Sequence, residues 1–290
     1  MKPPRFKYIA PRSPEEAVEY LARYEGDARC LSGGQSLLPL MNFRVVRPQA
    51  LIDLNRCGNL DYLRREDDRL IVGPMTTQSA AEHSELVRAC CPLLSKTLPY
   101  LGPPTIRNRG TIGGTLAHAD RNAELPAVAV VLEAELIAQG PQGLRTIAAD
   151  EFFHGDLTTD LRADEMLREI RFPVSQRRSI CAFVEANNRH HDLALAGIAV
   201  FLLLDNDSVV EKARLSCIGI GPRPIRLKGV EQILCGTRAD NAAIEYAQRF
   251  SLDGIEPEGD IHASAEYRRT LLPRLVRRAL EQAVADGPKQ

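Results

Sequence analysis

Two glycine-centred segments carry the residue types from which a phosphate-binding site can be built. The first reads Leu31-Ser32-Gly33-Gly34-Gln35-Ser36-Leu37-Leu38, and the second reads Arg109-Gly110-Thr111-Ile112-Gly113-Gly114-Thr115. Glycine lets the backbone turn its N–H groups toward a ligand, and successive N–H groups form a concavity that binds anions. Hydroxyl side chains add further donors. The two segments together predict a diphosphate site that could hold a dinucleotide from two sides.

Other chemistries have less support in the sequence. There is no G-x-S-x-G elbow and no P-loop lysine, so acyl and phosphoryl transfer are not expected. None of the six histidines has helical i, i+4 spacing with another metal ligand, so we expect no metal site. His190 and His191 precede Asp192, where a general base is conceivable, although a polar start to the next strand is the simpler interpretation.

The cysteines do not form a metal or iron–sulfur pattern. They are Cys30, Cys57, Cys90, Cys91, Cys181, Cys217 and Cys235. No pair has C-x-x-C spacing, which zinc ribbons, thioredoxin-like sites and iron–sulfur loops require. We expect reduced, mostly buried thiols that pack as small hydrophobes. The adjacent Cys90 and Cys91 leave a redox-active pair as the alternative.

Composition describes a globular protein without a strong electrostatic preference. The 290 residues are enough for two or three domains, with 44% hydrophobic residues, 26% charged residues and a net charge of −1. Binding to nucleic acid or to a membrane surface is therefore not expected. No apolar run approaches the ~20 residues of a membrane span, and no secretory signal is visible. We expect a cytoplasmic protein.

The first 56 residues should form a small α/β unit that positions the first glycine segment. Ser13 can cap a helix beginning at Pro14, and Glu16 completes a capping box. The other elements expected are a strand over 28–31, a helical turn over 36–41 and a strand over 50–54. The glycine segment thus lies between a strand and a helix, but it lacks the G-x-G-x-x-G fingerprint. Taken alone, it also fits an ordinary chain connection.

Residues 57–175 should form a second region that positions the second glycine segment. The expected elements are strands over 60–63 and 69–72 around a charged turn, helices over 77–101 broken at Pro92 and Pro99, a helix over 124–132, a hairpin over 135–147 and a strand over 166–172. Residues 106–120 mix glycine, hydroxyls and charge without amphipathic period, which indicates a polar turn. Its N–H groups need partners, and a ligand is one natural partner.

Residues 176–290 read as a separate α+β domain. We expect antiparallel strands over 180–186, 194–204 and 209–220, followed by helices over 230–234, 240–250 and 264–285. The last helix carries Arg268, Arg269, Arg274, Arg277 and Arg278. The interleaved leucines indicate an amphipathic helix with a solvated basic face. Docking to a partner subunit explains this face better than nucleic acid does.

The paired glycine segments, in this order, resemble the FAD-binding medium subunit of the molybdenum hydroxylases. That family includes carbon monoxide dehydrogenase medium chains and the flavin domain of xanthine dehydrogenase. The likeness covers nearly the whole chain. Residues 107–120, with the run Arg107-Asn108-Arg109-Gly110-Thr111-Ile112-Gly113-Gly114, carry much of it, and 217–224 and 264–269 resemble the family's C-terminal domain.

The resemblance implies a PCMH-type (vanillyl-alcohol-oxidase-like) fold of class α+β. Two subdomains, 1–56 and 57–175, would clasp FAD, and an α+β domain of antiparallel strands and helices, 176–290, would follow. Glu124 falls where the family usually places an aspartate that bonds a flavin-side hydroxyl, and Leu101 and Leu167 fall at apolar positions that line the cofactor. The residues expected to bind FAD are Leu31, Ser32, Gly33, Gly34, Gln35, Ser36, Leu37, Leu101, Thr111, Ile112, Gly113, Gly114, Thr115, Glu124, Leu167 and Asp192.

One turn departs from the family pattern. Residues 189–194 match the family's turn beside the isoalloxazine, but His191 replaces a glycine and Leu193 replaces an aromatic residue. Some relatives place a lysine near Val184 or Glu185, and this chain has none there. We also expect Gly114→Val to abolish FAD retention, because a β-branched side chain would block close backbone approach and resist a positive φ.

The resemblance also implies a role within a complex. Substrate would be hydroxylated at molybdenum on a large molybdopterin-binding subunit, and electrons would pass through a small [2Fe–2S] subunit to FAD and then to an external acceptor. This oxidoreductase subunit would need no catalytic acid or base of its own, and the assembly expected is a dimer of heterotrimers. The alternatives are a flavin-free structural paralogue and a stand-alone FAD oxidoreductase.

Overall fold

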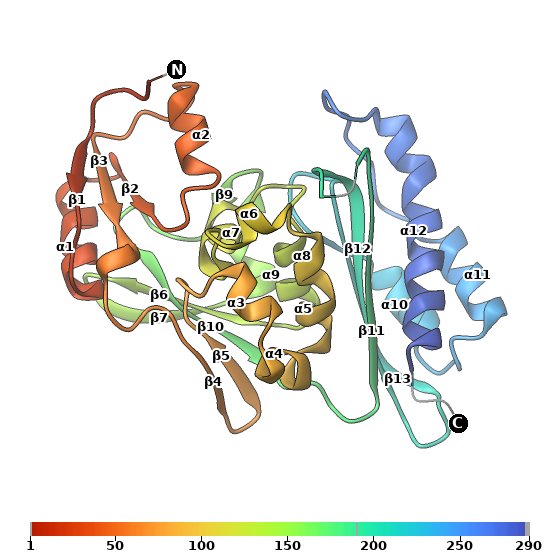
Figure 1. Ribbon diagram of the computed structural model, residues 1–290. Coiled ribbons are helices and arrows are strands. Elements are labelled where there is room, and N and C mark those ends of the chain that lie inside the picture. The colour runs from red at the N-terminus through yellow and green to blue at the C-terminus, as the bar shows by residue number, and fades with distance from the viewer. Residues whose placement is uncertain (1, 190, 288–290) are drawn as a thin grey trace.

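The computed structural model describes residues 2–189 and 191–287 and arranges the chain in three regions placed in a row (Figure 1). The N-terminal region contains a three-stranded parallel sheet of order β1-β3-β2. Its elements are β1 (Lys7–Ile9), α1 (Pro14–Arg23), β2 (Ala28–Leu31), α2 (Leu37–Asn42), β3 (Ala50–Asp53) and the 3-10 turn η1 (Leu54–Arg56). The first glycine segment connects β2 to α2, as expected. The strand β1 was not predicted.

Helix α1 forms for the reasons that the sequence provides. The Ser13 hydroxyl accepts a hydrogen bond from the Glu16 N–H, and Pro14 occupies the first helical position. Ala17, Val18 and Leu21 form the buried face of the helix. The capping box is not closed as predicted, because the Glu16 carboxylate accepts from the Arg12 N–H at 2.8 Å instead of from the N–H of Ser13.

The middle region is an antiparallel sheet of order β4-β5-β10-β6-β7 with helices packed against it. Its strands are β4 (Leu63–Glu66), β5 (Arg69–Val72), β6 (Glu135–Gly140), β7 (Gly143–Ala148) and β10 (Met166–Pro173), with a small hairpin of β8 (Phe153–Gly155) and β9 (Thr158–Thr159). Its helices are α3 (Gln78–Glu82), α4 (Glu85–Cys90), α5 (Pro92–Thr97), the 3-10 turn η2 (Leu98–Tyr100), α6 (Pro104–Arg107), α7 (Ile112–His118), α8 (Glu124–Val131) and α9 (Ala149–Phe152).

Two predictions for this region were wrong. The strand expected at 60–63 begins only at Leu63 and runs through the charged residues that were assigned to a turn. It is an edge strand, where charged side chains can remain in water: Arg64 pairs with Glu66 and Glu169. The second glycine segment is helical, because residues 112–118 form α7, with Thr111 as its N-cap.

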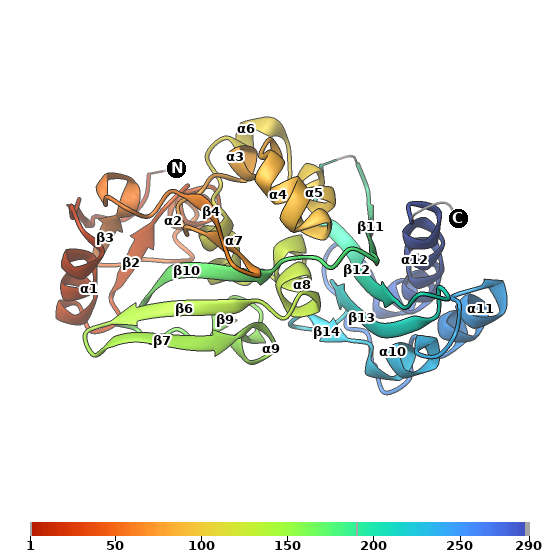
Figure 2. The same cartoon turned by 90° about the horizontal axis from the view of Figure 1, so that it is seen from below.

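The C-terminal region is a sheet of order β11-β12-β13-β14, antiparallel as predicted. It contains β11 (Ser179–Asn187), β12 (Ala194–Leu204), β13 (Val210–Ile218), β14 (Ile225–Arg226), α10 (Lys228–Leu234), α11 (Asn241–Arg249) and α12 (Ala265–Ala285). Helices α10 to α12 cover one face, and α5 and α8 of the middle region pack on the other (Figures 1 and 2). Cover on both faces explains why β12 is an almost uninterrupted apolar run.

The boundary after residue 175 is not a break in the hydrophobic core. Leu70 and Phe172 from the middle region share one core with Phe183 and Phe201 from the C-terminal sheet. The opposite face of that sheet forms a second core with α10 to α12. Among the described residues, no helix has the length and apolar character needed to cross a membrane.

One arginine of the last helix, α12, does not lie on the solvated basic face that was predicted. Arg268 is fully buried, whereas Arg269, Arg274, Arg277 and Arg278 are not. Its guanidinium donates to the carbonyl of Leu195 at 3.0 Å, to the carbonyl of Glu258 at 2.7 Å and to Asp260 at 2.6 Å. Arg268 therefore ties α12 to the start of β12 and to the loop before the helix.

Candidate cofactor-binding site

The first glycine segment presents a run of free backbone donors. Gly34 has a φ of +72°, which reverses the chain between β2 and α2. Within the described chain, the N–H groups of residues 33 to 37 donate to no protein acceptor. Clustered N–H groups of this kind form a concavity that suits a phosphate oxygen. The segment can therefore bind an anion such as a diphosphate.

This segment is held from behind by the end of β3. The Asn55 side-chain amide donates to the Ser32 carbonyl at 3.0 Å and to the Asp53 carboxylate at 2.6 Å. The Tyr8 hydroxyl donates to the same carboxylate. The loop is thus anchored through its carbonyl while its N–H groups stay available. Sequence reasoning missed Asn55 and Asp53, because nothing in their spacing connects them to Ser32.

In the second segment, the N–H groups of residues 112–115 already have partners inside the protein. Ile112 N–H donates to the Thr76 carbonyl at 2.9 Å, and Gly113 N–H donates to the Pro74 carbonyl at 3.0 Å. Gly114 N–H donates to the Thr111 hydroxyl at 2.9 Å, and Thr115 N–H to the Thr111 carbonyl at 3.1 Å. These groups were expected to hold the diphosphate. In this structure these donors are used within the protein, and their contact with a diphosphate stays a prediction.

Residues 74–78 support the second glycine segment. The Gln78 amide donates to the Thr115 hydroxyl at 2.8 Å, and Gln78 N–H donates to the Gly110 carbonyl at 2.8 Å. The buried Arg107 donates to the Gly102 carbonyl and pairs with Glu82 at 2.8 Å. Neither Gln78 nor Arg107 was predicted to support the site. Arg107 had been noted only as part of the family motif.

The fold brings the two glycine segments into direct contact. A Cβ atom added to Gly33 would lie 2.1 Å from the Arg109 carbonyl oxygen, and one added to Gly114 would lie 2.6 Å from the Ser32 hydroxyl. The Thr111 hydroxyl donates to the Ser32 hydroxyl at 3.2 Å. Gly114 does not have the positive φ that was expected, because it lies in the first turn of α7. Both glycines are required for the approach of one segment to the other.

Buried acceptor groups lie near the start of α8. Glu124 opens this helix and is buried, and burial raises the pKa of its carboxyl group to about 7. Glu185 on β11 is also buried, and burial together with the charge of Glu124 raises its pKa to about 8. Within the described chain, the Glu185 Oε2 and the Asn122 Oδ1 are buried without a hydrogen-bond partner. Such atoms fit the hydroxyl and N–H donors of a ligand.

Residues 191–194 show how the altered turn is arranged beyond residue 190. His191 has a φ of +66°, the left-handed conformation that favours glycine. Asp192 is exposed, and its carboxylate accepts from the Leu193 N–H at 3.0 Å. Leu193, which replaces the aromatic residue of the family pattern, is 38% exposed. His190, considered as a general base, lies outside the described residues.

Two predicted apolar positions belong to the core of the middle region. Leu101 and Leu167 are each 4% exposed and pack in the same hydrophobic core as Ile112. Leu167 lies at a bulge of β10. They remain predictions as cofactor-lining residues.

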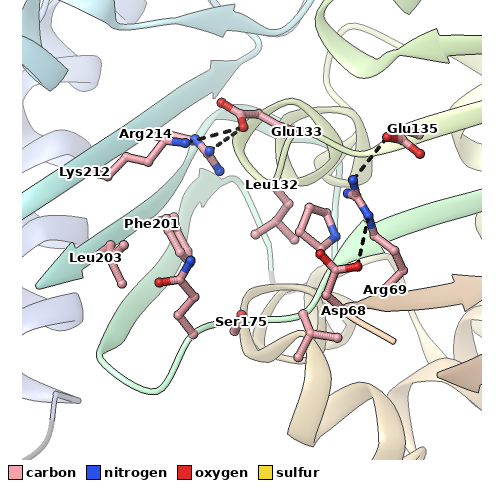
Figure 3. A pocket seen from close by; sticks show the side chains of 13 residues that line it. Asp68, Arg69, Leu132, Glu133, Glu135, Ser175, Phe201, Leu203, Lys212 and Arg214 are labelled. Carbon is pink, nitrogen blue, oxygen red and sulfur yellow. Dashed lines mark hydrogen bonds and ion pairs between the residues drawn. The ribbon is translucent and has the colours of Figure 1, made fainter. Parts of the chain in front are cut away.

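A separate pocket lies between the middle and C-terminal sheets and contains none of the predicted residues (Figure 3). Its volume is about 360 Å³, and its charged side chains are paired with one another: Arg69 with Asp68 and Glu135, Lys212 and Arg214 with Glu133. Charges that neutralise each other in this way do not suit a diphosphate. Over the described ranges, no group of three or more His, Cys, Asp or Glu side chains is placed to hold a metal ion.

The sequence and the structure both match known flavoproteins. Residues 4–175 match the family described as the FAD binding domain in molybdopterin dehydrogenase, and residues 181–283 match the CO dehydrogenase flavoprotein C-terminal domain. The chain is 37% identical to the 6-hydroxypseudooxynicotine dehydrogenase complex subunit alpha of Paenarthrobacter nicotinovorans, covering 98% of this chain and 96% of that one. It is 35% identical to the carbon monoxide dehydrogenase medium chain of Hydrogenophaga pseudoflava, covering 98% and 99%.

The structural match confirms the expected fold. The carbon monoxide dehydrogenase from Hydrogenophaga pseudoflava that lacks the Mo-pyranopterin moiety superimposes with a TM-score of 0.96 at 36% identity, covering 99% of this chain and 100% of that one. The N–H groups of residues 33–37 fit the diphosphate of the family's cofactor, and the acceptors near Glu124 fit its hydroxyl groups. The chain belongs to the family of FAD-binding medium subunits of the molybdenum hydroxylases, which are oxidoreductases, and FAD is its cofactor.

Proposed function

We propose that this chain is the electron-transfer subunit of a three-subunit molybdenum hydroxylase. Electrons from the [2Fe–2S] clusters of a small subunit would reach FAD on this chain and pass to an external acceptor, and substrate would be hydroxylated on a large molybdopterin-binding subunit. The flavin supplies the redox chemistry, and the protein supplies binding, orientation and electrostatics. The observation that carries the proposal is the contact of the two glycine segments around the free N–H groups of residues 33–37.

We assign the cofactor contacts by region. The diphosphate would lie against residues 32–37, with residues 111–115 as the opposite wall, and Glu124 would accept a hydrogen bond from a flavin-side hydroxyl. Leu101, Leu167 and Asp192 complete the assignment taken from the family resemblance. No residue of this chain is assigned as a catalytic acid or base. The protein's part is to hold the flavin and to keep water away from it.

The three-part division also belongs to the proposal. Residues 1–56 and 57–175 would be the two FAD-binding subdomains, and 176–290 the C-terminal domain. The separate sheets of the three regions support this division, although the middle and last regions share a core. We place the assembly, a dimer of heterotrimers, in the cytoplasm. Relatives named as subunits of dehydrogenase complexes support the need for partner chains.

Purification of the chain alone and with its neighbouring reading frames tests the proposal. The isolated chain should carry a flavin spectrum with a single FAD, and it should oxidise no organic substrate. Co-expression with a molybdopterin-type chain and a ferredoxin-like chain should give a stable complex with substrate-dependent flavin reduction. A colourless chain that takes up no added FAD would refute the proposal. Substrate oxidation by the isolated chain would instead identify a stand-alone oxidoreductase.

A further inference from the structure

The chain just after the first glycine segment leaves most of its apolar side chains in water. Helix α2 consists of five apolar residues and one asparagine, yet only Met41 among them is buried. Leu38 in the helix is 40% exposed, and beyond the helix Phe43 and Val45 are 68% and 70% exposed. Single apolar side chains on a surface are ordinary, but a run of them is typical of a place where another molecule binds. We call residues 38–47 the α2 hook.

Backbone hydrogen bonds hold the α2 hook in a compact shape. The Phe43 N–H donates to the Pro39 carbonyl at 3.0 Å, and the Val45 N–H donates to the Leu40 carbonyl at 2.9 Å. Arg44 has a φ of +58°, and the chain reverses at this residue. Figure 1 shows α2 at the upper end of the N-terminal region, and in the described part of the chain no other helix or strand packs extensively on it. The hook therefore presents its apolar side chains together.

The α2 hook also carries positive charge that this chain does not neutralise. Arg44 and Arg47 are exposed, and the Arg47 Nε donates to the Arg44 carbonyl at 3.0 Å. Neither guanidinium forms an ion pair over the described ranges, and residues 28–49 contain no aspartate or glutamate. Two exposed arginines of α12, Arg269 and Arg277, instead pair with glutamates of this chain. A surface that covers the hook must therefore supply both apolar contact and carboxylates.

A second copy of this chain is a poor fit for the α2 hook. Two identical copies related by a two-fold axis place the same surface patch against itself. Arg44 and Arg47 of one copy would then face the same two residues of the other copy, and like charges that face each other oppose binding. The occupant that the charges favour is a different chain with acidic side chains at its surface.

We propose that the α2 hook is the docking surface for a partner chain of the hydroxylase complex, one that presents an apolar groove bordered by aspartate or glutamate side chains. The proposal rests on the proposed function, since it takes this chain to work with partner subunits. Phe43 and Val45 would enter the groove, and Arg44 and Arg47 would pair with the carboxylates at its edge. Aromatic residues and arginine are enriched at interfaces, where a few buried side chains carry most of the affinity.

Titration of the full-length chain with the molybdopterin-type and ferredoxin-like chains, co-expressed and purified without it, tests the surface. Phe43→Ser combined with Val45→Ser should raise the Kd of the complex roughly a hundredfold, because two apolar anchors are lost. Arg44→Glu combined with Arg47→Glu should raise the Kd roughly tenfold at low ionic strength, and the wild-type Kd should rise with salt. Ile261→Ser is the matched control: this side chain is 94% exposed and lies outside the hook, so the Kd should not change.

Urea unfolding separates loss of docking from loss of folding. The variants replace side chains that are already in water, so their unfolding midpoints should equal that of the wild type. An unchanged Kd in the apolar variant would overturn the α2 hook as the docking surface, and an unchanged Kd in the charge-reversed variant would overturn the acidic partner. Wild-type dimers that disappear in the apolar variant, measured by light scattering, would assign the hook to a second copy and also overturn the proposal. Absence of any complex between the wild-type chain and the partner chains would overturn the proposed function instead.

Discussion

The Thr111 hydroxyl donates a hydrogen bond to the Ser32 hydroxyl at 3.2 Å, joining two segments that are 79 residues apart in the chain. Because Thr111 Oγ1 also accepts from the Gly114 N–H, its position is determined by α7. Ser32 is therefore held against the second segment. The Ser32 hydroxyl donates to no acceptor in the described part of the chain, so its hydrogen is available to a ligand.

Gly33→Ala should separate the two segments. The added methyl group would lie 2.1 Å from the Arg109 carbonyl oxygen, which is backbone and cannot rotate away. We expect FAD affinity to fall at least tenfold, about 1.4 kcal/mol, measured by fluorescence titration. Gly229→Ala is the matched control: nothing lies within 4 Å of its Cβ position in α10, so affinity should not change. Equal affinity of Gly33→Ala and wild type would contradict the contact.

Gly114→Val should abolish FAD retention because the side chain would block the close approach at this position, as expected, whereas the expected positive φ is absent. A Cβ at this position would lie 2.6 Å from the Ser32 hydroxyl and 2.7 Å from the Thr111 hydroxyl, so the valine would displace both. Flavin content after purification is the measurement. Gly114→Ala with Ser32→Ala should retain more flavin than Gly114→Ala alone, because removal of the Ser32 hydroxyl relieves one of the two close contacts. A normal flavin content in Gly114→Val would argue against the assignment of this wall.

Arg268→Met should destabilise the protein far more than Arg269→Met. Arg268 is fully buried with three bonded acceptors, including Asp260, which would be left without its partner. Arg268→Met would also leave the Leu195 carbonyl buried without its donor, which costs about 1–3 kcal/mol. Arg269 pairs with Glu256 at the surface, where such a bridge contributes about 0–1 kcal/mol. Urea unfolding of both variants would measure this, and similar midpoints would contradict the assigned role of Arg268.

Asp260 should make stability depend on acid pH. Burial alone would raise the pKa of this carboxyl group, but hydrogen bonds from Arg268 and from the N–H groups of His262 and Ala263 lower it to about 2. A depressed pKa stabilises the fold above the unfolded value near 4, and the contribution disappears as pH falls toward 2. Solvent screens this exposed carboxylate, so its contribution at neutral pH is smaller than the full pKa difference implies. Asp260→Asn should therefore lower the free energy of unfolding at pH 7 and change it much less at pH 2, measured by unfolding at both values. An equal loss of unfolding free energy at both pH values would contradict the lowered pKa of Asp260.

Sequence patterns predicted most of the fold, because local signals agree with the tertiary structure in these elements. Ser13 and Pro14 begin α1, and Asp240 caps α11 by accepting from the Ala243 N–H, as expected. The apolar run over 194–204 became the central strand of the last sheet. Residues 112–118 were missed as a helix because glycine and threonine are weak helix formers. Thr111 as a cap and the contacts of Gly113 with Pro74 compensate for this weakness.

The sequence by itself determined the two glycine segments, their order and the family, since these depend only on residue types along the chain. It could not decide which N–H groups remain free for a ligand. That depended on Thr76 and Pro74 occupying the donors of the second segment, while those of residues 33–37 stay open. Nor could it decide that Arg268 is buried or that the Glu185 Oε2 lacks a partner in the described part of the chain. Hydrogen bonds and desolvation depend on distances between residues far apart in the chain, and only the tertiary structure sets those distances.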